Sequence, residues 1–248
     1  MALSNEQWNA PSGDADFYEH QISHSLRLDR LSSSHLSLAA ANTSDNEDYW
    51  TFSWWWKSSP IATDQTILSA GSGSGTSDNL LELRLRTSDD NTIRSSSTEA
   101  NVFTTTAMYR DPSAWNHGCW SNNNGTSILY VNGIQVASGS LDGGAGGAIN
   151  KKNMTIGKYT LATSQYFEGY LAEMIMISHS DNAAVLTPTS FTETKNGVLI
   201  PKNVSGLSNK DFYLKFENSA ALGNDSSGND RDWTVNNISA HDQMLDSP

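Results

Sequence analysis

Three acidic residues near the N-terminus have a spacing that can serve hydrolysis. Asp14, Asp16 and Glu19 stand at positions i, i+2 and i+5, and on a strand such a spacing can aim an acid and a nucleophile at one glycosidic bond. No alternating apolar residues surround them to fix a strand, so we interpret the segment as a solvated acidic arm. We therefore predict no catalytic residue in it.

Two other carboxylates lie inside predicted strands. Glu82 alternates with Arg84 in the Leu-Glu-Leu-Arg-Leu-Arg run of residues 81–86, so we expect it to be a surface ion-pair partner on the solvated side of a sheet. Glu173 lies in residues 170–177, which are otherwise apolar on both faces and predict a central strand covered on both sides. Because burial of an unpaired carboxylate is costly, we expect Glu173 to have a structural partner rather than a catalytic role.

The chain offers no activated nucleophile. His117 and Trp115 stand two apart and share a face of any strand there, but no Gly-X-Ser-X-Gly elbow is present. Cys119 is the single cysteine and lacks a reactive-thiol signature. We interpret His117 as a structural histidine beside a core tryptophan.

Metal ligation is weakly supported. The remaining histidines are His20, His24, His35, His179 and His241. Only His20 and His24 have a His-X-X-X-His spacing, and the residues between them lack the glutamate of a His-Glu-X-X-His zinc motif, so we expect no zinc. Acidic loops at residues 45–48, 89–90 and 225–232 could supply oxygens to calcium, but residues 225–230 lack the distal glutamate of an EF-hand loop. We predict no cofactor, with calcium kept as the alternative and an Asx-type turn as the structural reading of Asp225.

Residues 49–57 predict the strand that organises the core. One face carries Trp50, Phe52, Trp54 and Trp56, and the other carries Thr51, Ser53, Trp55 and Lys57. Four large rings in register need a second sheet to cover them. The segment therefore indicates a β-sandwich with the first face in its core.

The other periodic segments are also β-like. Leu81, Leu83 and Leu85 share one face of a strand, and Asn132-Gly133 predicts a type I′ hairpin in which Val131 faces Ile134 and Leu129 faces Val136. Thr187-Pro188 predicts the single helix, about two turns long, that ends before Asn196-Gly197.

Composition excludes several classes of protein. A chain of 248 residues and 27.0 kDa fits one large sandwich, and its net charge of −12 disfavours nucleic acid. One cysteine allows no intrachain disulfide and indicates assembly in a reducing compartment. The sequence shows neither a secretory signal nor an apolar run long enough to predict membrane insertion.

Nine short motifs occur in an order that is more specific than any one of them. They are Ser25–Leu28, Trp50–Trp55 with Lys57, Asp111–His117, Leu129–Gly133, Ile156-Gly157, Phe167–Glu173, Leu186-Thr187 with Phe191, Phe212–Phe216 and Asp225–Asn229. In this order the chain resembles the laminin-G-like, concanavalin A-like jelly-roll modules found in virion proteins of tailed bacteriophages. The resemblance covers residues 24–239, leaving residues 1–23 as an N-terminal arm or attachment segment and residues 240–248 as a tail. It departs from the usual pattern at residues 118–125, where we expect a short or irregular strand.

The resemblance implies an all-β jelly-roll sandwich of two antiparallel sheets. It also implies a non-enzymatic virion structural protein, a capsid decoration, fibre or tail appendage at the virion surface that is assembled in the bacterial host cytoplasm. The implied partners are other virion proteins and host surface glycans, and by analogy the chain is a homo-oligomer, a trimer. The alternatives are a glycan-degrading enzyme of the same fold, a structural module that binds no sugar, and a free cellular lectin.

Glycan binding in such a module would rest on exposed aromatic and amide side chains. Candidate loops are residues 71–79, 120–125 and 141–147, together with the outer face of the tryptophan strand. The predicted ligand surface is Trp55, Trp120, Asn122, Asn123 and Asn124.

Overall fold

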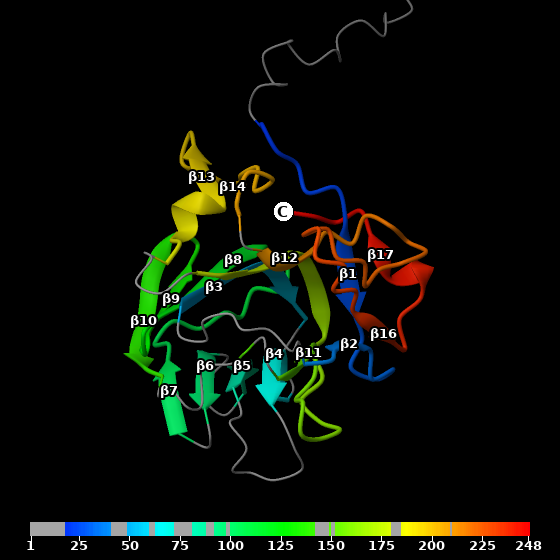
Figure 1. Ribbon diagram of the computed structural model, residues 1–248, viewed down its shortest axis with the longest axis horizontal. Coiled ribbons are helices and arrows are strands. Elements are labelled where there is room, and N and C mark those ends of the chain that lie inside the picture. The colour runs from blue at the N-terminus through cyan, green and yellow to red at the C-terminus, as the bar shows by residue number, and fades with distance from the viewer. Residues whose placement is uncertain are drawn as a thin grey trace, which may run out of the picture.

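The computed structural model describes residues 18–40, 49–59, 63–71, 81–87, 92–97, 100–141, 149, 152–179, 185–208 and 210–248. They form an all-β sandwich of two antiparallel sheets, as predicted (Figure 1). Two short 3-10 helices, η3 (Pro188–Ser190) and η4 (Ala240–Asp242), are the helices of these ranges. Within them no helix is long and apolar enough to span a membrane.

The larger sheet has eight strands in the order β10-β9-β8-β3-β12-β1-β17, with β15 also paired to β12. Their bounds are β1 Ser25–Leu28, β3 Tyr49–Ser58, β8 Asn116–Asn123, β9 Thr126–Val131, β10 Ile134–Ser140, β12 Gly169–Ser178, β15 Lys210–Leu214 and β17 Gln243–Met244. Residues 240–248, which the sequence predicts to be a tail, contain β17. This strand extends the sheet by pairing with β1.

The second sheet has seven strands in the order β16-β2-β11-β4-β5-β6-β7, and β13 and β14 form a separate hairpin above the larger sheet (Figure 1). The bounds are β2 His35–Leu38, β4 Gln65–Gly71, β5 Leu81–Arg86, β6 Thr92–Ser97, β7 Ala100–Thr104, β11 Asn153–Ile156, β13 Thr192–Lys195, β14 Val198–Pro201 and β16 Thr234–Asn236.

The aromatic face of β3 forms the centre of the core, as predicted. Trp50, Phe52, Trp54 and Trp56 are all buried between the two sheets. Phe52 and Trp54 stack with their ring centroids 4.8 Å apart. From the opposite sheet Leu81, Leu83 and Leu85 are buried in the same core.

Strand β8 is regular, which corrects the expectation of a short or irregular strand at residues 118–125. All eight of its residues pair with β3 without a register shift. Gly118 is required for packing rather than for a turn, because a Cβ atom there would collide with the Trp54 indole. Glycine thus lets the backbone of β8 approach the tryptophan row closely.

The Asn132-Gly133 hairpin has the predicted turn but a different register beyond it. Both residues have positive φ, 50° and 81°, as a type I′ turn needs, and Val131 pairs with Ile134. A bulge then places Ala137, instead of Val136, opposite Leu129. Ile134 is 69% exposed, so its side chain lies outside the core.

The predicted two-turn helix is wrong. Only the three residues of η3 are helical, and Asn196-Gly197 closes the β13–β14 hairpin instead of ending a helix. The φ angles of these two residues are 51° and 81°. An Asn-Gly pair with two positive φ angles between strands has the geometry of a type I′ turn.

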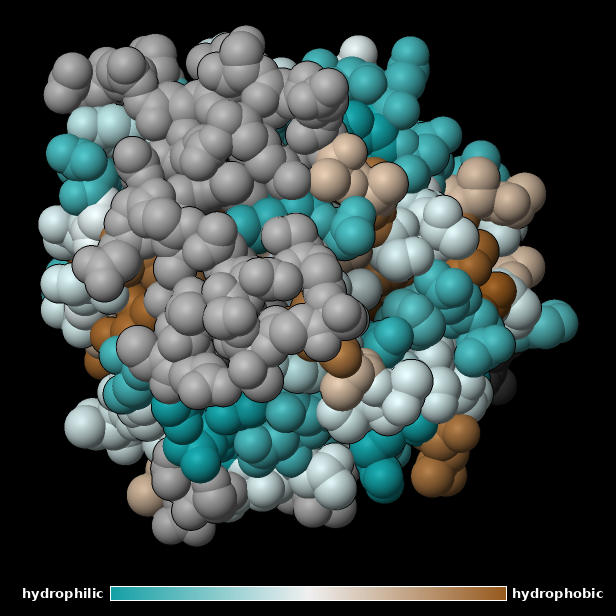
Figure 2. Space-filling model, turned by 60° about the horizontal axis from the view of Figure 1, so that its bottom comes forward, coloured by the Kyte–Doolittle hydropathy of each residue, from teal (hydrophilic) through white to brown (hydrophobic). Residues whose placement is uncertain are grey.

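The outer face of the seven-stranded sheet is polar but not fully solvated. Figure 2 shows one side of the molecule on which the described residues are mainly hydrophilic and the hydrophobic ones are scattered. Glu82, however, is only 2% exposed. It accepts a hydrogen bond from Thr66 at 2.7 Å and faces Arg84 at 3.2 Å. Gln165 also bonds to Thr66 and Arg84, so the expected surface ion pair lies beneath a covering segment.

The outer face of the eight-stranded sheet is covered by two segments. Residues 186–207 bury one part, with Phe191 and Val204 packed on Ile175 and Ile177. Residues 18–24 cross another part, where Ile22 packs on Trp55 and Ala172. Strand β12 is therefore covered on both faces, as its apolar sequence predicted.

Candidate functional site

A bulge in the largely buried strand β12 redirects the side chain of Glu173. Ala172 pairs with Trp55 and Ile175 with Ser53, so Glu173 and Met174 together stand opposite one residue of β3. Glu173 has a φ of 42°, in the left-handed region that residues with a side chain seldom occupy. Bulges of this kind redirect a side chain. Backbone strain of the kind that a positive φ imposes on Glu173 is concentrated at functional sites.

Glu173 has the structural partners that its position required. It is 4% exposed, and its Oε1 accepts a hydrogen bond from the Tyr213 hydroxyl at 2.6 Å. The same oxygen lies 2.8 Å from Nε2 of His20. The hydrogen bond to Glu173 raises the pKa of His20, and burial raises the pKa of Tyr213.

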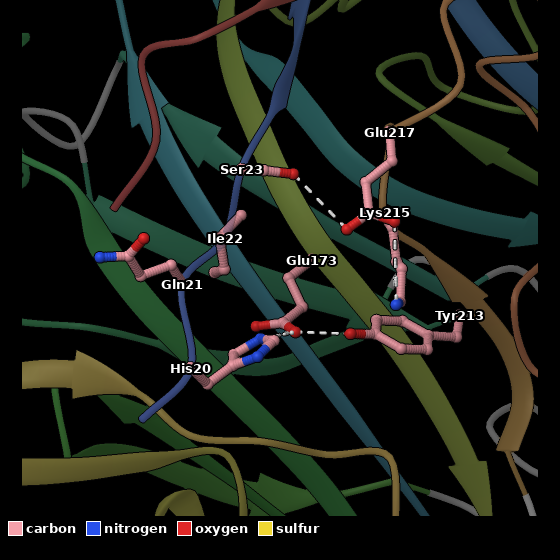
Figure 3. A pocket seen from close by; sticks show the side chains of 8 residues that line it. All are labelled: His20, Gln21, Ile22, Ser23, Glu173, Tyr213, Lys215 and Glu217. Carbon is pink, nitrogen blue, oxygen red and sulfur yellow. Dashed lines mark hydrogen bonds and ion pairs between the residues drawn. The ribbon is translucent and has the colours of Figure 1, made fainter. Parts of the chain in front are cut away.

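These side chains line a small hollow between residues 18–24 and the sheet (Figure 3). Lys215 and Glu217 stand at its edge, and Glu217 faces Ser23. The hollow has a volume of about 10 Å³, far below the about 300–1,000 Å³ of typical ligand pockets. Its arrangement therefore suits holding residues 18–24 to the sheet better than binding a substrate.

Three of the five predicted ligand residues are buried, which corrects that prediction. Trp55 is 4% exposed because Ile22 covers it and Leu199 packs beside it. Trp120 points into the core against Trp50, with ring centroids 4.8 Å apart.

Asn122 shares that inward face of β8 and is buried as well. Asn123 and Asn124 are exposed at the β8–β9 turn, so only these two remain accessible. The candidate loops at residues 72–79 and 142–147 lie outside the described residues.

Asp225 organises a turn through its own carboxylate. Its oxygens accept hydrogen bonds from the backbone N–H groups of Tyr213, Ser227 and Arg231 at 2.8–3.1 Å, and from the Ser227 hydroxyl at 2.6 Å. This is the Asx-type arrangement expected as the alternative to calcium. No group of three or more histidine, cysteine, aspartate or glutamate side chains in the described part of the chain could hold a metal. The acidic loops at residues 45–48 and 89–90 lie outside that part.

His117 is a fully buried neutral group. It hydrogen-bonds Ser53 at 2.9 Å and lies 5.0 Å from the Trp55 ring, and burial lowers its pKa to about 3. Cys119 is equally buried, which raises its thiol pKa and makes it unreactive. In the acidic arm, Glu19 pairs with Lys195 at 3.2 Å, and Asp14 and Asp16 lie outside the described residues.

An open cleft with a volume of about 190 Å³ lies at the start of β12. It is lined by Arg27, Leu28, Asp29, Ser59, Glu168, Gly169 and Tyr170. Arg27 is 46% exposed along its side chain, and Glu168, which pairs with Arg30, is one-third exposed. Hydrogen-bonding groups of both charges thus converge on one accessible space beside an aromatic ring.

The aromatic wall of this cleft is held by a clasp of four side chains. The Lys57 ammonium lies 4.6 Å from the Tyr170 ring centre and 5.5 Å from that of Trp115. Asp246 forms an ion pair with Lys57 and accepts a hydrogen bond from the Trp115 indole at 3.0 Å. Although burial opposes the change, these two bonds lower the pKa of Asp246. Tyr170 is therefore fixed in orientation and partly exposed.

The sequence patterns did not predict this cleft. Tyr170 was assigned to a strand covered on both faces, and Trp115 was placed in the core beside His117. The sequence did contain one indication of it. Lys57 falls on the outward face of its strand, and in the structure it pairs directly with Tyr170 of β12. Aromatic residues beside an outward lysine at a strand end indicate an accessible edge.

Comparisons with known proteins agree with this architecture. A family model described as the concanavalin A-like lectin/glucanases superfamily matches residues 31–186. The fold is similar to that of a proposed carbohydrate-binding protein from Bacteroides ovatus, with a TM-score of 0.58 and 13% identity over 91% of this chain. The chain spans 60% of the length of that protein.

Other solved structures are more distant. The SAP-like pentraxin of Limulus polyphemus has a TM-score of 0.49 at 13% identity, with 65% of this chain and 79% of that one covered. Domain 4 of a Geobacillus stearothermophilus arabinanase, solved with arabinotriose, has a TM-score of 0.45 at 18% identity, with 62% and 68% covered. No curated protein matches the chain in sequence.

Proposed function

This chain belongs to the concanavalin A-like lectin/glucanase superfamily, and we propose that it is a non-enzymatic carbohydrate-binding module of a phage virion. Its lectin-like jelly roll supports the first part of this proposal. The order of motifs that resembles phage virion modules supports the second. The similar Bacteroides protein supports the fold alone, because its sequence identity is 13%.

The observation that carries sugar binding is the open cleft beside Tyr170. A sugar presents hydroxyl groups that both donate and accept hydrogen bonds, together with an apolar ring face. The cleft offers Arg27 as donor, Asp29 and Glu168 as acceptors and Tyr170 as an aromatic surface. Its volume of about 190 Å³ is below the about 300–1,000 Å³ of pockets for drug-sized ligands, so the cleft would hold only a small part of a glycan.

On the virion we propose a surface role as a capsid decoration, fibre or tail appendage. The partners would be other virion proteins and, through the cleft, glycans of the host surface. We further propose a homo-oligomer, a trimer by analogy with phage appendages. Mass measurement in solution tests this state, and a monomer at micromolar concentration would count against a fibre.

A glycan array tests the proposed function. We expect the wild-type chain to bind at least one class of host-surface glycan on the array at millimolar sugar. A blank array, with the protein fixed on a symmetric lattice of the particle, would instead support a purely structural module.

The alternative of a glycan-degrading enzyme has one supporting observation. Glu173 and Glu217 line the same hollow, as paired catalytic carboxylates would. Its small volume and the satisfaction of Glu173 by Tyr213 oppose this role. Turnover of a host polysaccharide that is abolished by Glu217→Gln would establish the enzyme and overturn our proposal.

A further inference from the structure

Residues 18–24, called the strap from here on, are attached to the sandwich by side chains. His20 reaches Glu173 (Figure 3). Glu19 pairs with Lys195, and Ile22 packs on Trp55. Within the described part of the chain, no backbone–backbone hydrogen bond joins residues 19–24 to the sandwich. Segments without such bonds open at a lower free energy than the sheet beneath them. The strap can therefore detach while the sandwich stays folded.

His20 is the titratable anchor of the strap. Its ring faces Glu173 from β12, Tyr213 from β15, and Lys215 and Glu217 from the segment after β15. Lys215 is itself paired with Glu217 at 3.8 Å. Glu173 is thus the group whose charge acts most directly on the imidazole, at 2.8 Å.

We propose that the strap is a pH-sensitive latch, closed when His20 is protonated, whose opening uncovers Trp55 on the outer face of the larger sheet. Release leaves Glu173 with the Tyr213 hydroxyl as hydrogen-bond donor, so the carboxylate is not left unpaired. Trp55 loses the cover of Ile22 and becomes accessible. This inference does not depend on sugar binding.

The sign of the pH effect follows from the direction of the pKa change. In the closed state Glu173 raises the pKa of His20 above its ordinary value of 6.5. The closed state therefore binds the proton more tightly than the open state. Its added stability is fully present below the ordinary pKa and is lost as the pH rises through the raised one.

Limited proteolysis of the full chain tests the latch. A glutamate-specific protease cleaves after Glu19 only when the strap is open. After correction for the cleavage of an unstructured peptide at each pH, this rate should rise about fivefold from about pH 6 to about pH 8, which corresponds to about 1 kcal/mol for a partly exposed ion pair. The amides of β3 should stay protected from hydrogen exchange at both values. Equal corrected cleavage rates at the two pH values would overturn the proposal.

Two variants and a matched control separate His20 from other causes. His20→Gln retains a donor for Glu173 but cannot be charged, so the fivefold change should disappear. Glu173→Gln should remove it as well. His24→Gln changes another strap histidine, which hydrogen-bonds Ser23 at 2.8 Å, and should leave the change intact. Persistence of the full change in His20→Gln, with β3 still protected, would contradict the proposal.

Discussion

The hollow at Glu173 in the middle of β12 and the cleft at Tyr170 near its start differ in what their polar groups do. At the hollow the carboxylate is buried and its partners come from the protein, Tyr213 and His20. At the cleft Arg27 and Glu168 are partly exposed, although each has an ion-pair partner. A buried group with all its partners holds structure together, whereas an exposed group can exchange a protein or water partner for a ligand.

The largest expected difference concerns two tryptophans. Trp55→Ala beneath the strap should lower the free energy of unfolding by about 3–5 kcal/mol, as for other buried tryptophans. Trp115→Ala in the clasp that holds Tyr170 should cost about 1–2 kcal/mol, because a partly exposed ring buries less area. Urea denaturation measures both. If the two costs were equal, Trp55 would not be covered as described.

A second contrast concerns two carboxylates. Glu173→Ala should destabilise the chain by about 1–3 kcal/mol, because the Tyr213 hydroxyl would lose its acceptor in a buried site. Glu168→Ala should change stability by less than about 0.5 kcal/mol, since its ion pair with Arg30 is exposed. Thermal or urea unfolding of the pair decides this. If Glu173→Ala left the free energy of unfolding unchanged, the bulge would not depend on the carboxylate.

The third contrast is between two histidines that respond to pH in opposite directions. Burial lowers the pKa of His117 to about 3, so its contribution to stability is present above pH 6.5 and is lost as the pH falls. Between pH 6.5 and pH 5 the loss should be about 2 kcal/mol, at about 1.4 kcal/mol per pH unit.

His20 has the opposite sign, because the strap closes more tightly over the same interval. Urea unfolding at the two pH values measures the change in the free energy of unfolding of the whole chain. This change should become smaller in His117→Gln. If His117→Gln kept the full pH dependence, other groups would have to be responsible for it.

The sequence predicted the elements whose signal is local. Alternation placed Trp50 to Trp56 and Leu81 to Leu85 in the core, because period two sets the face of a strand directly. The Asn132-Gly133 pair predicted the turn, but it did not predict the bulge that follows at Val136. A bulge depends on how two whole strands fit together.

The candidate site could not be predicted because it depends on contacts between distant segments. Trp55 was assigned to an accessible face, and nothing near it in sequence indicates that Ile22 and Leu199 cover it. Likewise, the cleft needs Asp246 to fix Lys57 and Trp115, residues far apart in the chain. The partner of Glu173 was predicted in kind, from the cost of burial, but not as Tyr213 and His20.

The most direct test of the account compares the cleft with the exposed amides of the β8–β9 turn. The sugar identified on the array would be titrated by calorimetry into the wild type, Tyr170→Ala and the double variant Asn123→Ala/Asn124→Ala, with unfolding curves to confirm that each is folded. We predict that Tyr170→Ala weakens binding at least about tenfold, or about 1.4 kcal/mol, and that the double variant binds as the wild type does. Unchanged binding by Tyr170→Ala, with loss of binding in the double variant, would contradict the account.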